Sequence, residues 1–499
     1  MKTFKRKTFY TAVLAALGAM GAVGTASAVN VNPDGLGQAL MYPYYTVRNA
    51  GGTYNTYLSV VNTTASTKAV KVRFVEGKNS KEVLDFNLYL SPFDVWTGAV
   101  VPVSATDATQ GAKLITADRS CVTPTYVGNE SAFVFKNYAY AGVDAEATGL
   151  DRTNEGHFEM IEMGNVTGTI TTGIKHVAGV PANCGVLTDA AISAATIAGS
   201  GGLAGTASLI NVASGTDYGF NPVVLDDFNF VASTWSQAGS IFPNLSFVSP
   251  KVSKIFNGNN GVIISNWTSI ADRAVDPVSA VLMHDNVINE FVLDTVSLSA
   301  TDWVVTFPTK TFYVGNDVVV SGVRQNTAAI RPFQRNFGLG GACDEVSFTM
   351  HDREEASVTT ISTTSPPPPG PTADTLCWEA NVVTFKNAAG VTSNLLGSTN
   401  TRILDFSYQN GWANLAFPLV TAYPNAHQMT TAVGATTRLN NYTGVGVPTF
   451  TTGTGQYFGL PTVGFMLQNF VNGNVGTPPV MSSYGGNFDH KNTRTVTVF

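Results

Sequence analysis

Charge is scarce in this sequence. Only 12% of its 499 residues are Asp, Glu, Lys or Arg, against about 25% in an average soluble domain. Acidic residues number 34 and basic residues 28, which leaves a net charge of −6. A weakly charged, mildly acidic surface attracts neither phosphate backbones nor anionic lipid head groups. The composition therefore excludes a basic nucleic-acid binder, a coiled coil and a disordered acidic protein.

Short catalytic signatures are missing as well. The chain contains no G-x-S-x-G, H-E-x-x-H or G-x-x-x-x-G-K-[ST] pattern, and these patterns are typical of hydrolases, zinc peptidases and nucleotide-binding proteins. Its histidines are few and scattered. We therefore predict no catalytic residue, no cofactor and no metal site from local motifs.

Cysteine is rare, and its number is even. Cys121, Cys184, Cys343 and Cys377 are the four cysteines. An even count in an exported chain indicates disulfides, and four thiols allow three pairings. Sequence order favours Cys121–Cys184 and Cys343–Cys377. Zinc binding is the alternative, but there is no C-x-x-C pair and no histidine nearby.

The first 28 residues have the pattern of a secretory signal peptide. Four basic residues precede an uncharged, mainly apolar run over 11–25, and Ala26-Ser27-Ala28 matches a cleavage site. Removing residues 1–28 leaves 24 basic and 34 acidic residues, a net charge of −10. No later segment is apolar enough to predict a transmembrane helix. We expect an exported protein at the cell surface or outside the cell; the periplasm and the outer membrane are less favoured locations.

Alternation of apolar and polar residues predicts β-strands. In the strand predicted at 68–75, apolar residues at 70, 72 and 74 alternate with Lys71 and Arg73, which predicts one buried and one solvated face. Residues 83–90 alternate in the same way. Turn-forming residues at 76–80 join the two strands into a hairpin. Further strands are expected at 57–62, 94–101, 303–307, 311–314, 318–323, 345–350 and 382–386.

Helix is predicted only at 189–198, where Thr188 is a good N-cap and Gly199 a good stop; a loop is the alternative there.

The fold class that we predict is all-β, with an Ig-like β-sandwich followed by further antiparallel sheet. The predicted parts are a signal peptide at 1–28, an N-terminal β-sandwich at 29–225 with an Ala/Gly/Ser-rich insertion at about 188–215, a second β region at 226–361, a Pro-rich loop at 362–376 and a C-terminal β region at 377–499 packed on the second.

The Pro-rich loop contains Pro366 to Pro369, a run that cannot pair within a sheet. Cys343 and Cys377 flank it. If they are bonded, the run is a loop held at its base, and the residues after it continue the preceding sheet. If they are not, it is a spacer between domains. We favour the loop.

Glu155, His157, Glu159 and Glu162 form the densest group of titratable residues. On a strand, His157 and Glu159 share a face, which suits a metal-ligand pair or an acid–base pair. The simpler interpretation, which we favour, is the polar face of a half-exposed strand. A second charged run, at 351–355, is interpreted as a solvated turn. The six tryptophans are interpreted as core residues in preference to sugar-binding platforms.

Four short sequence segments are distinctive when taken together: NPDGLGQ at 32–38, YPYYTVR at 42–48, LSPFDVWT at 90–97 and DWVVTFPTK at 302–310. With them the chain resembles a family of uncharacterised exported, β-rich cell-surface proteins of Gram-negative bacteria. The resemblance implies export and a surface location. It implies no activity, cofactor or catalytic residue.

The leading functional hypothesis is a structural or interaction protein of the cell surface or extracellular matrix, with self-association into a layer or fibre as one form. Its partners would then be further copies of itself or surface glycans, and not nucleic acid. One alternative is a secreted hydrolase that uses His157 and Glu159, and another is a carbohydrate-binding adhesin. An outer-membrane barrel is less favoured, because threonines share a face with Phe499 where an apolar band is needed.

Overall fold

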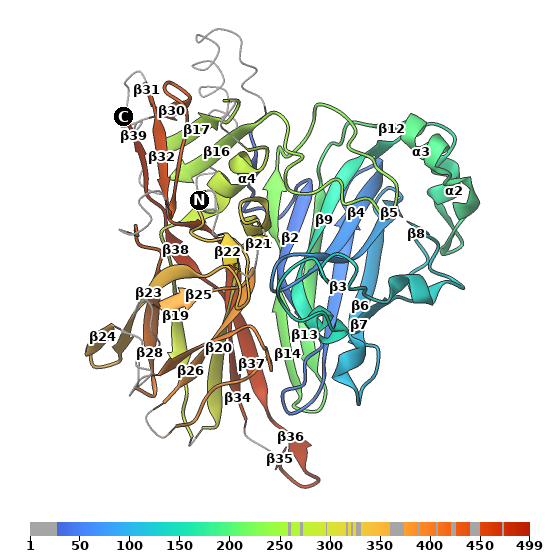
Figure 1. Cartoon of the computed structure of the whole chain (residues 1–499). Coiled ribbons are helices and arrows are strands. Elements are labelled where there is room, and N and C mark those ends of the chain that lie inside the picture. Colours follow the sequence, from blue (N-terminus) through green and yellow to red (C-terminus); the bar gives the residue numbers. More distant parts are fainter. Residues whose placement is uncertain are drawn as a thin grey trace, which may run out of the picture.

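The computed structural model shows an all-β protein (Figure 1), as the sequence predicts. The predicted signal peptide at 1–28, apart from Ser27 and Ala28, and the predicted Pro-rich loop up to residue 373 lie outside the described residues. The structure describes residues 27–257, 261–269, 273–295, 297–315, 318–320, 323–325, 331–359, 374–387, 390–405, 408–420, 426–439, 450–471 and 474–499.

Two antiparallel sheets face each other in the N-terminal half, as in a β-sandwich; its Ig-like character stays a prediction. The larger sheet has the order β1 (Asn30–Val31), β15 (Val223–Asp226), β2 (Ala39–Thr46), β9 (Glu155–Val166), β4 (Thr67–Glu76), β5 (Glu82–Leu90) and β8 (Cys121–Thr123), with β12 (Thr196–Ile197) beside β9. The five-stranded sheet has the order β14 (Thr216–Phe220), β13 (Leu203–Asn211), β3 (Tyr54–Asn62), β6 (Val95–Pro102) and β7 (Ala112–Ile115).

The space between these two sheets is filled by apolar and aromatic side chains. Tyr42 stacks on Phe158 with ring centroids 4.2 Å apart, and Phe86 packs against Trp96. All four side chains are buried. Alternating strand residues supply this core, because every second side chain points to the same face of a strand.

Two further sheets form the body of the C-terminal half. One has the order β24 (Ser357–Thr359), β23 (Asp344–Asp352), β28 (Asn410–Ala416), β19 (Asn286–Val292) and β38 (Lys491–Thr493), with β25 (Asp374–Leu376) also on β23. The other has the order β27 (Thr401–Asp405), β26 (Ala380–Lys386), β20 (Ser299–Thr306), β34 (Val463–Phe470) and β37 (Tyr484–Asp489). Both sheets therefore mix strands from before and after the Pro-rich segment.

Smaller sheets lie at the end of the C-terminal half that carries the C-terminus (Figure 1). One has the order β16 (Val252–Asn257), β17 (Gly261–Asn266), β30 (Thr436–Leu439) and β31 (Phe450–Gly453); another joins β29 (Gln428–Thr430), β32 (Gly455–Phe458) and β39 (Val496–Val498). Two-stranded pairs occur elsewhere in both halves: β10 (His176–Val177) with β11 (Val180–Pro181), β18 (Met283–His284) with β33 (Leu460–Pro461), β21 (Val318–Val320) with β22 (Val323–Gln325), and β35 (Asn474–Val475) with β36 (Val480–Met481).

Helix is scarce in the described residues, where the α-helices are α2 (Thr171–Ile174), α3 (Asp189–Ala195) and α4 (Asp276–Leu282). The predicted helix α3 is present, and the Thr188 hydroxyl accepts a hydrogen bond from the Ala191 N–H as its N-cap. It ends three residues early because Thr196–Ile197 pairs with β9 instead. The strand predicted at 311–314 is wrong, since Lys310–Phe312 forms a 3-10 turn.

The segment predicted as an insertion at about 188–215 is only partly one. Its second portion is β13, which pairs with β3 over nine residues, from Leu203 opposite Asn62 to Asn211 opposite Tyr54. Small residues such as Gly205 suit this position: a Cβ on Gly205 would lie 2.0 Å from the Tyr42 hydroxyl. An Ala/Gly/Ser-rich sequence therefore forms a central strand.

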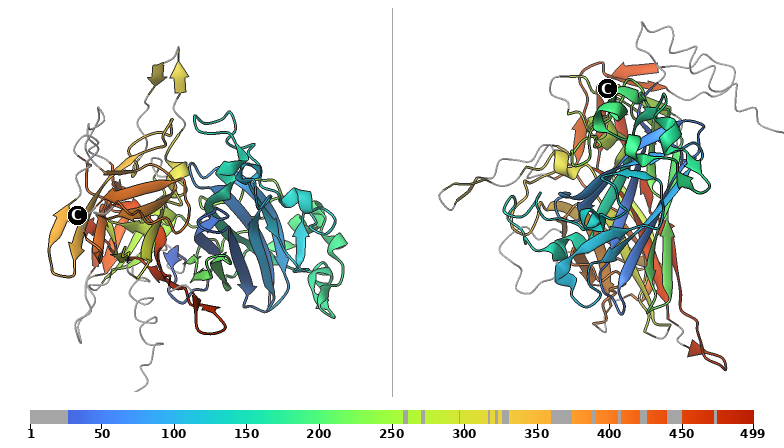
Figure 2. Two further views of the ribbon diagram at one scale, coloured as in Figure 1. Left: turned by 90° about the horizontal axis from the view of Figure 1, so that it is seen from below. Right: turned by 90° about the vertical axis from the view of Figure 1, so that its right-hand side faces the viewer.

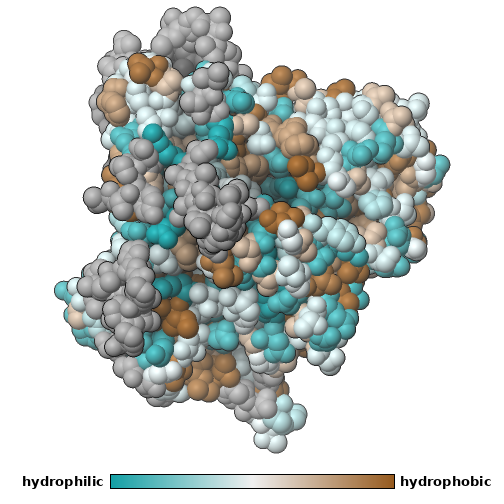
Figure 3. Space-filling model, viewed as in Figure 1, coloured by the Kyte–Doolittle hydropathy of each residue, from teal (hydrophilic) through white to brown (hydrophobic). Residues whose placement is uncertain are grey.

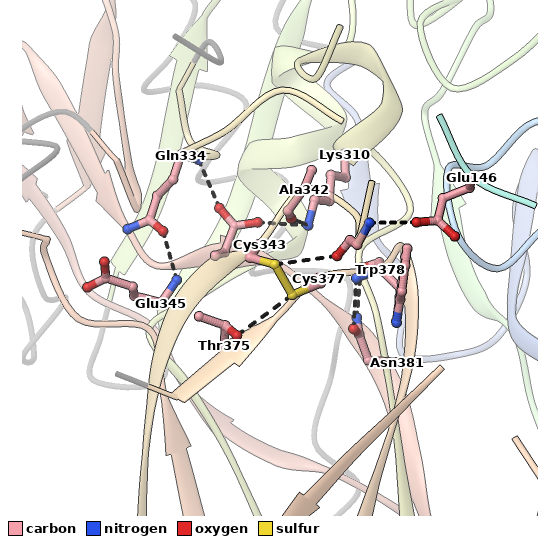
Figure 4. Close-up of a disulfide and its surroundings, with 12 residues drawn as sticks. Glu146, Lys310, Gln334, Ala342, Cys343, Glu345, Thr375, Cys377, Trp378 and Asn381 are labelled. Carbon is pink, nitrogen blue, oxygen red and sulfur yellow. Dashed lines mark hydrogen bonds and ion pairs between the residues drawn. A yellow bond between two sulfur atoms is a disulfide. The ribbon is translucent and has the colours of Figure 1, made fainter. Parts of the chain in front are cut away.

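Both disulfides form in the pairing that sequence order favours, Cys121–Cys184 and Cys343–Cys377. Cys343 directly precedes β23 and Cys377 directly follows β25, and these strands pair with Asp344 opposite Leu376. Figure 4 shows this bond beside Lys310, which forms a 2.8 Å ion pair with Asp344. The chain on either side of the Pro-rich segment is thus held at its base, and the spacer alternative is wrong.

Candidate functional site

The four titratable residues singled out from the sequence lie on β9, the strand between β2 and β4. Glu159 is opposite Arg73 and His157 is opposite Val75 in the register of β9 with β4. His157 and Glu159 are only 5% and 6% exposed. The interpretation of a half-exposed strand is therefore wrong, since β9 is buried on both faces over almost its whole length.

Ion pairs explain how charged residues occupy this buried face. The Arg73 guanidinium contacts both Glu82 and Glu159 on this face. On the opposite face of the sheet, the Lys68 ammonium lies 2.6 Å from Glu162. A charge removed from water is tolerated when an opposite charge and hydrogen bonds replace its hydration. The solvated face predicted for β4 is thus a buried ionic layer.

Residues 234–239 cover part of that layer. The Lys71 ammonium contacts Asp85 at 2.6 Å and the Gln237 carbonyl at 3.3 Å. The Asn87 amide donates to the Ser236 carbonyl, and the Gly239 N–H donates to Asp85. Periodicity could not reveal this cover, because the covering segment comes some 150 residues later in the chain.

Burial controls the charge of the His157 and Glu159 side chains. Burial, and secondly the nearby Arg73 charge, lowers the pKa of His157 to about 3, so its imidazole is neutral at neutral pH. Burial raises the pKa of Glu159, and the Arg73 guanidinium opposes that rise. The structure brings His157 and Glu159 onto one face, as predicted, but within packed protein that a substrate does not reach.

Glu155 and Glu162 have structural partners too. Glu155 accepts hydrogen bonds from the Tyr44 and Ser398 hydroxyls and pairs with Arg48. Glu162 also accepts from the Gly201 N–H. Ser398 belongs to the C-terminal half, so Glu155 links the two halves of the molecule.

The outer face of the five-stranded sheet is the surface that the sequence analysis missed. We call it the hydroxyl face. Its side chains are the alternate residues of β3, β6, β13 and β14 that point away from the core. A shallow hollow of about 470 Å³ lies on it, lined by Tyr57, Leu58, Ser59, Thr97, Gly98, Thr206, Ala207, Ser208, Asp217, Gly219, Phe220 and Asn221.

The register places the polar groups of the hydroxyl face in rows. Tyr57, which is 47% exposed, lies opposite Ser208 on one side and Ala99 on the other. Ser59 lies opposite Thr206 and Thr97, and the Ser59 and Thr206 hydroxyls are 3.1 Å apart. Small neighbours leave the Tyr57 ring accessible among hydroxyl groups. In the sequence, the feature that indicated this face is the set of polar residues that alternate with apolar ones in the strand predicted at 57–62.

Tryptophan occupies mainly core positions. Trp96, Trp267 and Trp303 are buried, whereas Trp412 is 41% exposed and stacks on His351 with ring centroids 4.3 Å apart. His351 and Asp352 end β23, and exposed residues 353–355 form the turn that follows. The solvated-turn interpretation of 351–355 thus applies only to its second part.

Within the described ranges, no group of three or more His, Cys, Asp or Glu side chains is placed to hold a metal ion. No helix in the part of the chain that the structure describes is long and apolar enough to cross a bilayer. The two disulfides indicate an oxidising compartment and not the cytoplasm.

Comparison of the chain with protein-family models, with curated proteins and with solved structures gives no match.

Proposed function

We propose that this chain is an exported interaction protein of the cell surface or extracellular matrix, and that the hydroxyl face is its contact surface. The observation that carries the proposal is the composition of that face. Of the residues that line its hollow, Asp217 alone is ionisable at neutral pH. A surface that is polar yet almost uncharged suits partners that are themselves neutral and rich in hydroxyl groups.

Neutral carbohydrate is the partner class that this chemistry favours. Sugars present hydroxyl groups at their edges and apolar C–H groups on their faces. An exposed aromatic ring packs against the C–H face, and surrounding hydroxyl, amide and carboxylate groups exchange hydrogen bonds with the edges. Tyr57 supplies the ring, while Thr206 and Asn221 are among the polar groups around it.

Glycan-array binding by the purified protein tests this proposal. We expect Tyr57→Ala to weaken binding of a neutral glycan at least tenfold, because the stacking platform is lost. Tyr138→Ala is the matched control, since Tyr138 is 81% exposed but does not line the hollow. Unchanged binding by Tyr57→Ala, or no binding to any neutral glycan, would contradict the proposal.

Self-association is a second candidate, favoured by the hairpin β35–β36. This hairpin projects from the body of the molecule (Figures 1 and 2), and residues 476–480 within it are exposed. A projecting arm with an exposed Val480 suits contact with a neighbouring subunit. Figure 3 shows hydrophobic residues scattered over the visible side, with no single dominant patch. Sedimentation of the protein with and without residues 476–479 separates this candidate from glycan binding.

A further inference from the structure

A second hollow lies where the N-terminal sandwich meets the C-terminal half, and we call it the junction groove. Its volume of about 620 Å³ falls within the range of about 300–1,000 Å³ that is usual for small-molecule sites. Elements distant in sequence contribute to it. Its lining residues are Val31, Pro33, Val223, Lys254, Ile255, Phe256, Val281, Leu282, His284, Thr462, Val463, Asn492, Thr493 and Arg494.

The lining combines two kinds of surface. The apolar lining residues that keep accessible surface are Val31, Pro33, Val223 and Phe256, and they favour a hydrocarbon part in the ligand. Arg494 and Lys254 bring positive charge into the same groove. The protein as a whole is acidic, so a groove whose described lining includes Arg494 and Lys254 but no Asp or Glu is not a general property of its surface.

Arg494 differs from the buried cations of this protein. The side chains of Lys68, Lys71, Arg73, Arg152 and Lys310 are buried, and each forms an ion pair with a carboxylate. Arg494 forms none within the described part of the chain. Its Nε donates to the Met283 carbonyl at 2.9 Å and its Nη2 donates to the Val281 carbonyl at 2.6 Å.

The bonds that Arg494 makes hold its guanidinium in place without neutralising it. Both carbonyls lie at the C-terminal end of α4, where an arginine commonly caps the helix. The remaining contact of Nη2, at 3.3 Å, is to His284 Nε2. Burial and then the Arg494 charge lower the pKa of His284 to about 3, so this histidine is neutral. Arg494 Nη1 has no hydrogen-bond partner among the described residues.

The carboxylates near these cations leave them largely available. Lys254 Nζ lies 3.5 Å from Asp227 Oδ2, which is a long contact for an ion pair. Asp285 accepts hydrogen bonds from the Thr493 and Thr495 hydroxyls. The positive charge of the groove is thus held rigidly at Arg494 and loosely at Lys254.

We infer that the junction groove binds a small amphiphilic oxyanion. A carboxylate or phosphate head group would pair with Arg494, with Lys254 supplying a second positive charge in the same groove, and a short hydrocarbon part would lie along the apolar lining. Guanidinium groups bind both head groups through two parallel N–H donors. This inference is independent of the hydroxyl face, because it concerns different residues and a different ligand class.

Isothermal titration calorimetry with the purified full chain tests the inference. The probes are octanoate and octyl phosphate; acetate and inorganic phosphate carry the same head groups without hydrocarbon, and octanol carries the hydrocarbon without charge. We expect octanoate or octyl phosphate to bind at least tenfold more tightly than its short analogue and than octanol. The tighter of the two probes identifies the head group.

Variants locate the binding to the groove. Lys254→Gln should weaken the preferred probe about tenfold and should reduce the dependence of binding on salt, because one attractive charge is lost. Lys491→Gln is the control, since Lys491 lies on β38 close to the groove but is exposed and outside its lining. Arg494→Gln should abolish binding, and its circular dichroism spectrum checks that α4 and the fold are retained.

Two results would overturn the inference. One is octanol binding as tightly as octanoate and octyl phosphate, which would make the groove a purely apolar site. The other is equal binding by Lys254→Gln and Lys491→Gln together with no salt dependence. Failure of glycan binding at the hydroxyl face would leave this test unaffected.

Discussion

At the scale of single residues, the main feature is the burial of charge on the large N-terminal sheet. Lys68, Lys71 and Arg73 come from one strand, and their carboxylate partners come from β5 and β9. Such pairs cost desolvation energy, so they add less to stability than apolar contacts of the same volume. The pairs of Lys71 and Arg73 do require a particular register, because a shift of one residue would turn these two charges toward the apolar core between the sheets.

Breaking one of these pairs should destabilise the protein strongly. Arg73→Met leaves the Glu159 and Glu82 carboxylates without their partner, and we expect the free energy of unfolding to fall by about 3–5 kcal/mol. Urea denaturation measures this change. Arg73→Met combined with Glu159→Met removes both the charge and its partner and should recover part of the loss. A single variant as stable as the parent would show that the carboxylates have access to water.

Residue-scale prediction from sequence was correct about which side chains share a face and wrong about the surroundings of that face. The alternation at 68–75 correctly placed Lys71 and Arg73 on one face and the apolar residues on the other. The same alternation predicted that the charged face is exposed to solvent, because charged side chains are almost always exposed unless they are paired. The partners of these charges lie on other strands, and no local pattern identifies them.

At the scale of elements, strands with clear alternation were predicted within a few residues of their observed bounds. β4, β5, β20 and β26 are examples. Two predictions failed where tertiary contacts compete with local preference. Residues 311–314 are apolar enough for a strand, yet Lys310 is held in a turn by its ion pair with Asp344. β13 has few strand-forming residues, yet it pairs along all of β3.

The disulfide Cys343–Cys377 should stabilise the pairing of β25 with β23. A double Cys343→Ser/Cys377→Ser variant releases a loop whose ends are 34 residues apart, and we expect the free energy of unfolding to fall by about 4 kcal/mol. Hydrogen exchange should quicken at residues 374–376 and stay unchanged in β13.

The Cys121→Ser/Cys184→Ser variant is the matched comparison, because that bond joins β8 to the small core beneath α2 and α3. Its hydrogen exchange should change there and not at β25. Equal exchange at 374–376 in all three proteins would contradict the role of Cys343–Cys377.

At the scale of the whole molecule, buried polar contacts join the two halves. The Thr306 hydroxyl donates to the Pro43 carbonyl at 2.8 Å, and the Ser80 hydroxyl donates to Glu379 at 2.7 Å. Glu379 is 2% exposed. Burial raises the pKa of Glu379 to about 8, although the hydrogen bond from Ser80 acts to lower it. The carboxyl group is therefore protonated at neutral pH in the folded protein.

Two buried histidines and Glu379 should change the stability of the fold with pH in opposite directions. Below about pH 6.5, unfolded histidines bind protons while His157 and His284 in the folded state stay neutral down to about pH 3, so stability falls as the pH is lowered. Glu379 acts in the opposite direction. Its unfolded carboxyl ionises near pH 4.5 and its folded carboxyl near pH 8, so its contribution decreases as the pH rises between those values.

Denaturation of the Glu379→Gln variant at several pH values tests this account. Above about pH 6.5 the histidines no longer contribute, so we expect the parent to lose stability up to about pH 8 and the variant to lose clearly less. The acid side of the profile should keep its histidine-dependent fall in both proteins. Parallel profiles for parent and variant above pH 6.5 would show that Glu379 is ionised in the folded state.

The sequence by itself determined the all-β class, the positions of the strongest strands, the helix at Thr188 and the favoured pairing of four cysteines, because each depends on local periodicity, capping or order along the chain. The tertiary structure alone decided what lies on each sheet face. It buried His157 and Glu159, left Tyr57 exposed among hydroxyl groups, and placed Arg494 and Lys254 in the lining of one groove. Burial and charge pairing depend on segments far apart in sequence, and only folding brings those segments together.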